Sequence, residues 1–238
     1  MKAEKSLWDS GHTKNAAYDD PAFLERTWID KKKLKRQKGY AFVKRAMDLF
    51  LSCFGLVLIS PVMIWVAYRI NKEEPRASVI FAQERIGRNG RPFRMYKFRS
   101  MCVNAEEQLT DLLIKNEVKG AMFKIKEDPR VTPFGKFIRR TSLDELPQLI
   151  NVIKGEMSLI GPRPPLKREV AEYSQYDKQR LLVKPGCSGA WQVSGRSDIH
   201  FEEMVELDVH YINTRTTRAD LLLIVKTLKV MLTSSGAY

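Results

Sequence analysis

The hydrophobic pattern of the chain is dominated by one uninterrupted apolar stretch. Between Asp48 and Arg69, the twenty residues Leu49–Tyr68 carry no charge. Twenty apolar residues are about what a helix needs to cross the roughly 30 Å hydrocarbon core of a bilayer. The pattern therefore predicts a membrane helix here, and the remaining elements are placed around it.

A proline lies just past the middle of this stretch, in the pair Ser60-Pro61. Pro61 has no backbone N–H and its ring crowds the carbonyl of Val57, so a helix should kink or break there. Basic residues crowd both flanks: Lys31, Lys32, Lys33, Lys35, Arg36, Lys38, Lys44 and Arg45 before it, and Arg69, Lys72, Arg76, Arg85, Arg88, Arg91, Arg94, Lys97 and Arg99 after it. Basic residues favour the cytoplasmic side of a membrane, so a straight crossing would leave one set on the wrong side.

We therefore predict a re-entrant anchor, a helix–break–helix that enters and leaves by the same face, with its break at Ser60 and Pro61. A proline-kinked single span and a buried core helix are the two alternatives that the residues leave open. The basic run Lys31–Lys38 before the anchor fits contact with anionic lipid headgroups, or a solvated linker.

Weaker patterns predict the elements further along the chain. Two strands are expected on either side of the turn signal Asn89-Gly90, and together they form a small, strongly basic β-hairpin. These strands cover Val79–Glu84 and Phe93–Met101, and helices are expected over Pro21–Ile29, Glu106–Lys119 and Phe201–Tyr211.

The C-terminal stretch Asp220–Thr233 is strongly apolar but contains Lys226 and Lys229. It is expected to lie on a membrane surface or to pack on the core, because it is too short and too charged to cross. The elements together predict an α+β, monotopic membrane protein in three parts. Residues 1–40 form a polar and basic extension, residues 41–71 the membrane hairpin, and residues 72–238 a cytoplasmic domain with interfacial amphipathic helices.

Composition narrows the class of partner. The 238 residues carry a formal charge of +13, with a sequence pI of about 9.7, which calls for an anionic partner. With an apolar anchor present, an anionic membrane surface and phosphorylated substrates are favoured over nucleic acid. Three widely spaced cysteines, Cys53, Cys102 and Cys187, predict neither a disulfide framework nor a zinc site and fit a reducing compartment.

The most suggestive polar residues are the adjacent carboxylates Asp144 and Glu145, which follow Arg139 and Arg140. Adjacent side chains on a helix point about 100° apart, so the two carboxylates would have different roles. One could bind a metal or attack phosphorus while the other orients a proton or a basic neighbour. The structural alternative is a capping box, in which Ser142 and Glu145 satisfy the first turn of a helix.

Two further segments are candidates for phosphate binding. Arg163 lies between Pro162 and Pro164, which restrict its backbone and would preposition its guanidinium for a two-pronged contact with phosphate. A rigid loop with a solvated arginine is the alternative. The segment Lys184–Asp198 contains three glycines and a further arginine, which suggest a close backbone approach to a ligand: Gly186, Gly189, Gly195 and Arg196.

Six motifs in this order resemble the bacterial sugar transferase family, whose members are monotopic polyprenyl-phosphate phosphoglycosyl transferases. The resemblance covers roughly the last two hundred residues. The motifs are KRAMDL before the anchor, Ser60-Pro61 within it, YKFRSM at Tyr96–Met101, SLDELPQL at Ser142–Leu149, SLIGPRP at Ser158–Pro164 and KPGCSGAWQVSGR at Lys184–Arg196.

The resemblance implies a reaction in which a sugar-1-phosphate passes from a UDP-sugar to undecaprenyl phosphate with release of UMP. By the family's motifs, Asp144 is the nucleophile and a ligand of Mg²⁺, and Glu145 is its dyad partner. Arg139, Arg163 and Arg196 are implied to hold phosphate, with Lys97 as a weaker candidate. The resemblance also implies a location on the cytoplasmic face of the bacterial inner membrane, and a homo-oligomer is left open.

The motifs resemble relatives that move hexose-1-phosphate, from UDP-glucose or UDP-galactose, in exopolysaccharide or capsule synthesis. An N-acetylated UDP-sugar stays open as a donor. A second hypothesis, from a different class, is a non-catalytic membrane-anchored adaptor or regulator whose basic face binds lipid or nucleic acid. The Asp144 carboxylate separates the two, since only the enzyme needs it.

Overall fold

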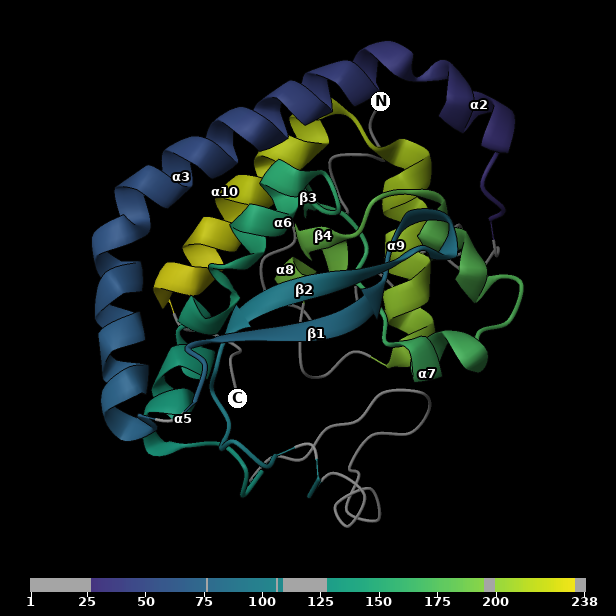
Figure 1. Ribbon diagram of the computed structural model, residues 1–238. Helices are drawn as coiled ribbons and strands as arrows, with labels where there is room; N and C mark the ends of the chain where they lie inside the picture. The colour runs from purple at the N-terminus through teal and green to yellow at the C-terminus, as the bar shows by residue number, and fades with distance from the viewer. Residues whose placement is uncertain (1–26, 76, 106, 109–127, 195–199, 234–238) are drawn as a thin grey trace.

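One long helix, α3 (Lys38–Glu73), curves around the outside of the molecule, and shorter helices and two small sheets lie inside its curve (Figure 1). This computed structural model describes residues 27–75, 77–105, 107–108, 128–194 and 200–233. The α+β class predicted from the sequence is confirmed. Most of the helices expected over Pro21–Ile29 and Glu106–Lys119, and also Arg196, lie outside the described residues, and the described residues 27–29 are not helical.

The predicted break at Ser60 and Pro61 does not divide the anchor into two helices, because Pro61 lies within the continuous helix α3. The helix instead bends about midway along its length (Figure 1). Without an N–H, Pro61 cannot donate to the carbonyl of Val57. The Ser60 hydroxyl donates to that same carbonyl at 2.8 Å, so the serine supplies the hydrogen bond that the proline removes. An unpaired carbonyl in lipid would be costly, which explains the pairing of the two residues.

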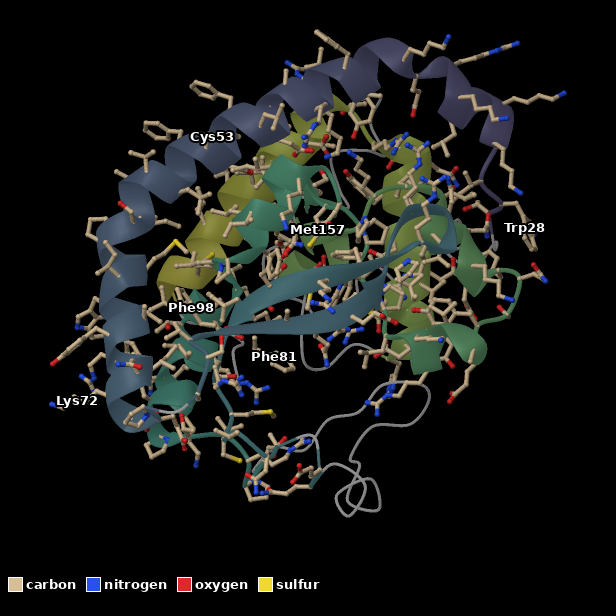
Figure 2. The ribbon with its side chains drawn as sticks, viewed as in Figure 1. Trp28, Cys53, Lys72, Phe81, Phe98 and Met157 are labelled. Carbon is tan, nitrogen blue, oxygen red and sulfur yellow. The ribbon has the colours of Figure 1, made fainter. Side chains whose placement is uncertain are left out.

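Most of the apolar side chains of α3 lie on its outer surface. The helix is long and apolar enough to cross a membrane, and only 11% of its most apolar window is buried within the protein. Figure 2 shows Cys53 on this outer side. The exposed large apolar side chains of α3 are Phe42, Val43, Phe50, Phe54, Val57, Leu58, Val62, Ile64, Trp65 and Tyr68. A buried core helix is therefore excluded, because a core helix would cover these side chains.

Both ends of α3 contact the rest of the protein. Near its start, the Lys44 ammonium and the Tyr40 hydroxyl reach the buried carboxylate of Asp220 at 3.0 and 2.8 Å. Near its end, Val66 and Ile70 are buried in a core cluster with Phe98, Phe134 and Ile138. The exposed apolar surface thus lies between two attachment points.

The predicted β-hairpin is confirmed. Strands β1 (Ile80–Ile86) and β2 (Pro92–Phe98) pair antiparallel, with Ile80 opposite Phe98 and Ile86 opposite Pro92. The short 3-10 turn η2 (Arg88–Gly90) joins them, and Asn89 and Gly90 adopt positive φ angles of 59° and 77°. Asparagine and glycine tolerate this conformation best, which is why they signalled the turn.

A second sheet was not predicted. Strands β3 (Ser158–Ile160) and β4 (Gly186–Ser188) pair in parallel, and three residues are too short to carry a readable alternation. The other elements of this half are α7 (Lys167–Ala171), the 3-10 helix η5 (Asp177–Leu182) and α8 (Ala190–Ser194).

The glycines of this sheet allow backbone to approach backbone. A Cβ atom on Gly186 or Gly189 would collide with the backbone of Gly161, and a Cβ on Gly161 would collide with that of Gly186. The sequence suggested that Gly186 and Gly189 bring the backbone close to a ligand. Their close neighbour in the structure is the Gly161 segment, which leads into Pro162 and Arg163.

The expected C-terminal helices are confirmed as α9 (Phe201–Thr214) and α10 (Thr217–Thr233). Helix α9 supplies much of the main core, and α10 adds Leu223 to it. The opposite side of α10 stays exposed and apolar through Leu221, Leu222, Val225 and Leu228. This helix therefore both packs on the core and presents an apolar surface.

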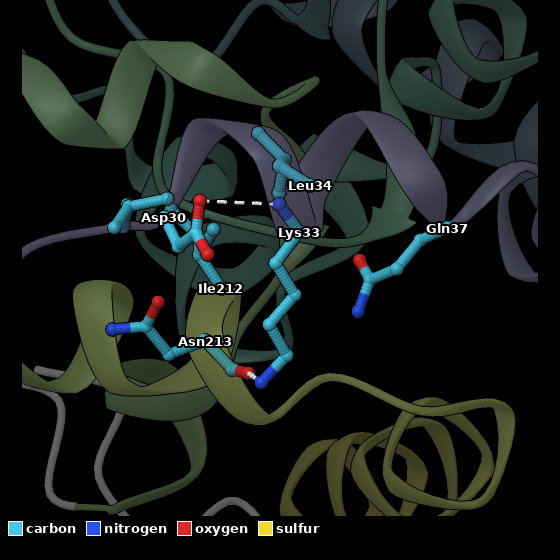
Figure 3. Close-up of a pocket in the computed structure, with 7 residues that line it drawn as sticks. Asp30, Lys33, Leu34, Gln37, Ile212 and Asn213 are labelled. Atoms are coloured by element: carbon cyan, nitrogen blue, oxygen red, sulfur yellow. Dashed lines mark hydrogen bonds between the residues drawn. The ribbon is translucent and has the colours of Figure 1, made fainter.

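The basic run before the anchor forms a short helix, α2 (Lys31–Arg36), capped by Asp30, whose carboxylate accepts from the backbone of Lys32 and Lys33. The Lys33 ammonium reaches the carbonyl of Asn213 at the end of α9, beside a shallow pocket between the two helices (Figure 3). None of the residues that line this pocket belongs to the predicted site.

Candidate active site

Asp144 and Glu145 lie on a 3-10 turn, η4 (Leu143–Glu145), between the helices α5 (Pro133–Arg140) and α6 (Gln148–Lys154). We call residues 132–155 the dyad segment. Thr132 begins it by capping α5, with its hydroxyl accepting from the backbone of Gly135 at 2.9 Å. Gly155 ends it with a φ of 82°, in the left-handed conformation that commonly terminates a helix.

The turn that carries the carboxylates is made by Ser142, which has a positive φ of 55°. Its side chain makes no capping hydrogen bond, so the alternative interpretation of Ser142 and Glu145 as a capping box is excluded. A 3-10 turn entered from a left-handed residue does not present its first N–H groups to Ser142 as an α-helix would. Glu145 is instead directed to another partner, Lys97.

Asp144 is the buried member of the dyad, with 7% of its surface exposed. The Lys97 ammonium lies 3.9 Å from Asp144 Oδ2. Burial raises the pKa of Asp144 to about 6; the positive charges of Lys97 and Arg139 hold it down, and the negative charge of Glu145 adds to the rise. The carboxylate is therefore ionised at neutral pH although little water reaches it.

Glu145 is more exposed and forms the shorter contact. Its Oε1 accepts from the Lys97 ammonium at 2.7 Å, and 44% of its side chain is exposed. Lys97 comes from β2, on the neighbouring hairpin, so one ammonium faces both carboxylates. A residue that the sequence made only a secondary candidate thus lies at the centre of the site.

Two of the predicted phosphate-binding arginines, Arg139 and Arg163, lie in the described residues and occupy different parts of the site. Arg139, in the last turn of α5, lies near enough to Asp144 for its charge to act on that carboxylate. Arg163 lies in the loop after β3 and pairs with the buried Glu169. The Nη1 atom of Arg163 donates to the two carboxylate oxygens of Glu169, at 3.1 and 3.4 Å.

Arg85 is a site residue that the sequence reasoning did not single out. Arg85 is 8% exposed, and in the described part of the chain its guanidinium donates to neutral groups, the Pro164 carbonyl at 3.0 Å and the Gln83 amide oxygen. Burial and the neighbouring charge of Arg163 lower the pKa of Arg85 to about 9, while the charges of Glu169 and Glu145 oppose the change.

The hairpin register would have pointed to Arg85. Residues directly opposite each other in an antiparallel pair share a face, and every second residue along a strand returns to it. Phe81 opposes Lys97 and Arg85 opposes Phe93, so Lys97 and Arg85 lie on one face of the hairpin. That face carries positive charge from the dyad toward the Arg163 loop.

The residues present are compatible with one hard divalent cation. Among the described residues, no group of three or more histidine, cysteine, aspartate or glutamate side chains forms a ready-made metal site. Mg²⁺ is commonly held by one or two carboxylates together with substrate phosphate oxygens. Asp144 and Glu145 are adjacent carboxylates next to a positively charged surface, which meets that requirement.

An ionised, poorly hydrated carboxylate among cations is suited to covalent attack on an anionic substrate. A carboxylate nucleophile would normally be repelled by phosphate, and the positive charges of Lys97, Arg139, Arg85 and Arg163 offset that repulsion. Burial of Asp144 also keeps most of the surrounding water away from its carboxylate.

The fold and this site define a class of protein. Residues 39–234 match the bacterial sugar transferase family, and the chain belongs to that family. The predicted family membership is confirmed, and the match includes the anchor helix, the dyad and the Arg163 loop.

Three relatives have names that specify galactose. The galactosyl transferase CpsE of Streptococcus agalactiae is 49% identical over 200 residues, 84% of this chain and 44% of the relative. The undecaprenyl-phosphate galactose phosphotransferase of Salmonella typhimurium is 44% identical over 206 residues, 85% and 43% of the two chains. The UDP-galactose-lipid carrier transferase of Erwinia amylovora is 41% identical over 201 residues, 83% and 42%.

The chain therefore spans less than half the length of these relatives. Other relatives are named for glucose or N-acetylgalactosamine, so membership of the family does not by itself fix the sugar.

Proposed function

We propose that this protein transfers a sugar-1-phosphate from a UDP-sugar to undecaprenyl phosphate and releases UMP, as the first step in building an exopolysaccharide or capsule. The family and the names of the relatives support the reaction class. The observation that carries the proposal is the buried Asp144 carboxylate, ionised at neutral pH and flanked by Lys97 and Glu145.

The reaction proceeds in two displacements at one phosphorus atom. A carboxylate oxygen of Asp144 bonds to the phosphorus that carries the sugar, and the bond from that phosphorus to the UMP oxygen breaks, so UMP leaves with the electron pair. A phosphate oxygen of undecaprenyl phosphate then attacks the same phosphorus. The acyl phosphate bond breaks, Asp144 is regenerated, and the sugar is left on a lipid diphosphate.

The surrounding residues orient and neutralise the phosphates. Lys97 and Arg139 lie beside the nucleophile and stabilise charge on the transferring phosphoryl group. Glu145 holds the Lys97 ammonium in place through its 2.7 Å contact. Arg163, with Arg85 behind it, would bind the more distant phosphate, and Arg196 is retained as a third phosphate-binding residue.

Asp144, with Glu145 beside it, would also hold the Mg²⁺ expected from the family resemblance. When bound, the ion supplies positive charge that lowers the repulsion between nucleophile and substrate.

Galactose is the first choice of sugar, because it appears in the names of three relatives that are at least 41% identical. The test measures UMP release from a panel of UDP-galactose, UDP-glucose, UDP-N-acetylglucosamine and UDP-N-acetylgalactosamine, each with and without undecaprenyl phosphate. Turnover with UDP-galactose that depends on the lipid phosphate supports the proposal. A preference for an N-acetylated donor would replace galactose as the proposed sugar. If no donor releases UMP, the proposed reaction is wrong.

The adaptor hypothesis is less well supported. A protein that only binds lipid through its basic surface has no use for a buried carboxylate, which costs stability. It would bind anionic vesicles equally well with and without Asp144, and it would release no UMP.

Lys97 gives the reaction a predictable pH dependence. Activity requires ionised Asp144, so it should fall as the pH drops through about 6. Lys97→Gln removes the cation that most lowers this pKa, and the acid limb of kcat/KM should move up by about one pH unit. The control is Arg94→Gln on the opposite, exposed face of β2, which should leave the limb in place. An unmoved limb in the Lys97 variant would show that Asp144 is not the titrating group.

For the membrane, we propose that α3 is re-entrant and that the protein lies on the cytoplasmic face of the inner membrane. Both ends of α3 contact the same domain, which is difficult to reconcile with a full crossing, since that would carry one end about 30 Å away. The exposed lysines of α2 and the apolar side of α10 would contact anionic headgroups and the lipid boundary.

Cysteine labelling tests this topology. In a background with Cys53, Cys102 and Cys187 changed to serine, single cysteines at Gly39 and Asn71 should both react with an impermeant reagent only from the cytoplasmic side. Both positions are exposed, and a Cβ at Gly39 meets no atom within 4 Å. Labelling of either position from outside would establish a full span.

A further inference from the structure

Helix α3 is hydrogen-bonded to the start of the dyad segment. The Glu73 carboxylate, in the last turn of α3, accepts from the Thr132 hydroxyl at 2.8 Å and from the Phe134 backbone N–H at 3.1 Å. Thr132 is the N-cap of α5, so Glu73 adds a negative charge where the helix has unpaired N–H groups.

The same helix is also hydrogen-bonded to the end of the dyad segment. The Arg45 guanidinium, near the start of α3, donates to the carbonyls of Val152 and Ile153 at 2.6 and 2.9 Å. These carbonyls lie in the last turn of α6, where a cation is favourable, and that of Val152 also accepts from the Gly155 backbone N–H at 2.9 Å. The fork of an arginine suits two adjacent carbonyls in a way that a lysine does not.

A third residue of α3, Asp48, attaches the helix to the strand that precedes the Arg163 loop. Asp48 lies one helical turn after Arg45 and is 3% exposed, and its carboxylate accepts from the Leu159 backbone in β3 at 3.1 Å. The strand then leads through Gly161 into the Arg163 loop. Residues from one turn of α3 therefore hold both elements that carry the predicted phosphate chemistry.

Between its two ends, α3 also packs along the dyad segment. Gly55 is the point of close approach to α6, where a Cβ would lie 3.7 Å from a methyl carbon of Leu149. Further along, Val66 and Ile70 pack with Ile138 of α5. The bend of α3 lies between these contacts, so the shape of the helix fixes how far apart Arg45 and Glu73 lie.

We propose that Arg45 and Glu73 are positioning residues, which hold the dyad segment from both ends and so set the position of Asp144. The membrane helix is then part of the active-site scaffold as well as an anchor. This inference rests on the proposed function, because it assigns the purpose of the bonds to the Asp144 nucleophile. A helix whose only task is attachment to lipid needs no bonds to both termini of one catalytic segment.

The test compares Arg45→Gln, Arg45→Lys and Glu73→Gln with the wild-type chain in nanodiscs of defined anionic and neutral lipid. Arg45→Gln should lower kcat by about 10- to 100-fold, because small displacements of a reacting group are costly, with the KM for UDP-sugar changed less than about threefold. Arg45→Lys should be intermediate. Glu73→Gln should have a smaller effect, because its hydrogen bond from Thr132 is exposed and the amide oxygen can still accept.

The matched controls are Lys38→Gln, at the start of α3, and Glu74→Gln, at its C-cap. Each removes a like charge from a residue for which the described structure shows no hydrogen bond or ion pair to the dyad segment. Membrane association and cysteine accessibility are measured for every variant. A loss of kcat that merely follows a loss of membrane association would overturn the proposal, as would wild-type kcat in both the Arg45 and Glu73 variants.

A second measurement separates this inference from the proposed function. Amide hydrogen exchange of residues 143–154 needs no substrate, and Arg45→Gln should speed it at least about tenfold while the Lys38 control leaves it unchanged. If no UMP is released by the wild-type chain but exchange changes as expected, the reaction is wrong and the positioning stands. Unchanged exchange contradicts the positioning itself.

Discussion

Asp144→Asn is expected to abolish UMP release, by about 10³-fold or more, while the protein stays folded and membrane-bound. The amide fills the same space as the carboxylate but cannot act as a nucleophile toward phosphorus, so the first displacement cannot begin. Initial rates of UMP release measure the effect. Glu145→Gln is the control at the adjacent position, and we expect a smaller loss because that side chain acts through Lys97.

The same variant should be more stable than the wild-type chain at alkaline pH. The pKa of Asp144 is raised from 3.8 to about 6 by folding, chiefly because burial disfavours the charged form. Ionised Asp144 therefore destabilises the folded state above about pH 6, and this cost disappears as the pH falls below about 4. At pH 8, Asp144→Asn should increase the free energy of unfolding by on the order of 1–3 kcal/mol.

The increase in stability also shows that lost activity is not a folding defect. A variant that is inactive and less stable at pH 8 would mean that Asp144 holds the fold together. A variant that turns over at the wild-type rate would remove Asp144 from the nucleophile role.

Asp208→Ala should cause the largest loss of stability that the structure predicts, about 3–5 kcal/mol. Asp208 and Arg180 are both almost fully buried, and two guanidinium nitrogens lie 2.8 and 2.7 Å from Asp208 Oδ2. Removing the carboxylate leaves a buried positive charge that keeps the Tyr173 hydroxyl, at 2.8 Å, the face of that ring and the more distant charge of Glu169. Thermal unfolding in detergent measures the loss.

The double variant Arg180→Met, Asp208→Leu is the control for this prediction. Replacing both members of a buried ion pair with apolar residues is often neutral or stabilising, so the double variant should recover most of the loss. A single variant that costs less than about 1 kcal/mol would mean that water reaches Arg180.

The parts of the fold that could be predicted are those whose signals are local. The uncharged run of α3, the Asn89-Gly90 turn and the apolar pattern of α9 each act within a few residues of sequence. The parallel pair β3 and β4 was missed because its strands are short and their pairing joins distant segments. The break at Pro61 was overestimated, because Ser60 restores the missing hydrogen bond and lets the helix continue.

The candidate site likewise combines residues that the sequence indicates with contacts that depend on long-range packing. The family resemblance indicated Asp144 and Glu145, but the residues alone allowed a capping box, and only the positive φ of Ser142 excludes it. The Lys97 contact depends on packing of the hairpin against η4, which no spacing in the sequence encodes. The bonds from Arg45 and Glu73 are equally long-range, so KRAMDL could be recognised as a motif without a structural reason for its arginine.

The central claim is that Asp144 is esterified by a phosphosugar during turnover. The most direct test is to incubate the protein with UDP-galactose labelled in the sugar, without lipid acceptor, then quench, digest and locate the label by mass spectrometry. The account predicts one phosphohexose on the peptide that contains Asp144, formed with an equal amount of UMP and discharged when undecaprenyl phosphate is added. Lipid-linked product formed under conditions where Asp144 never carries the label would contradict it.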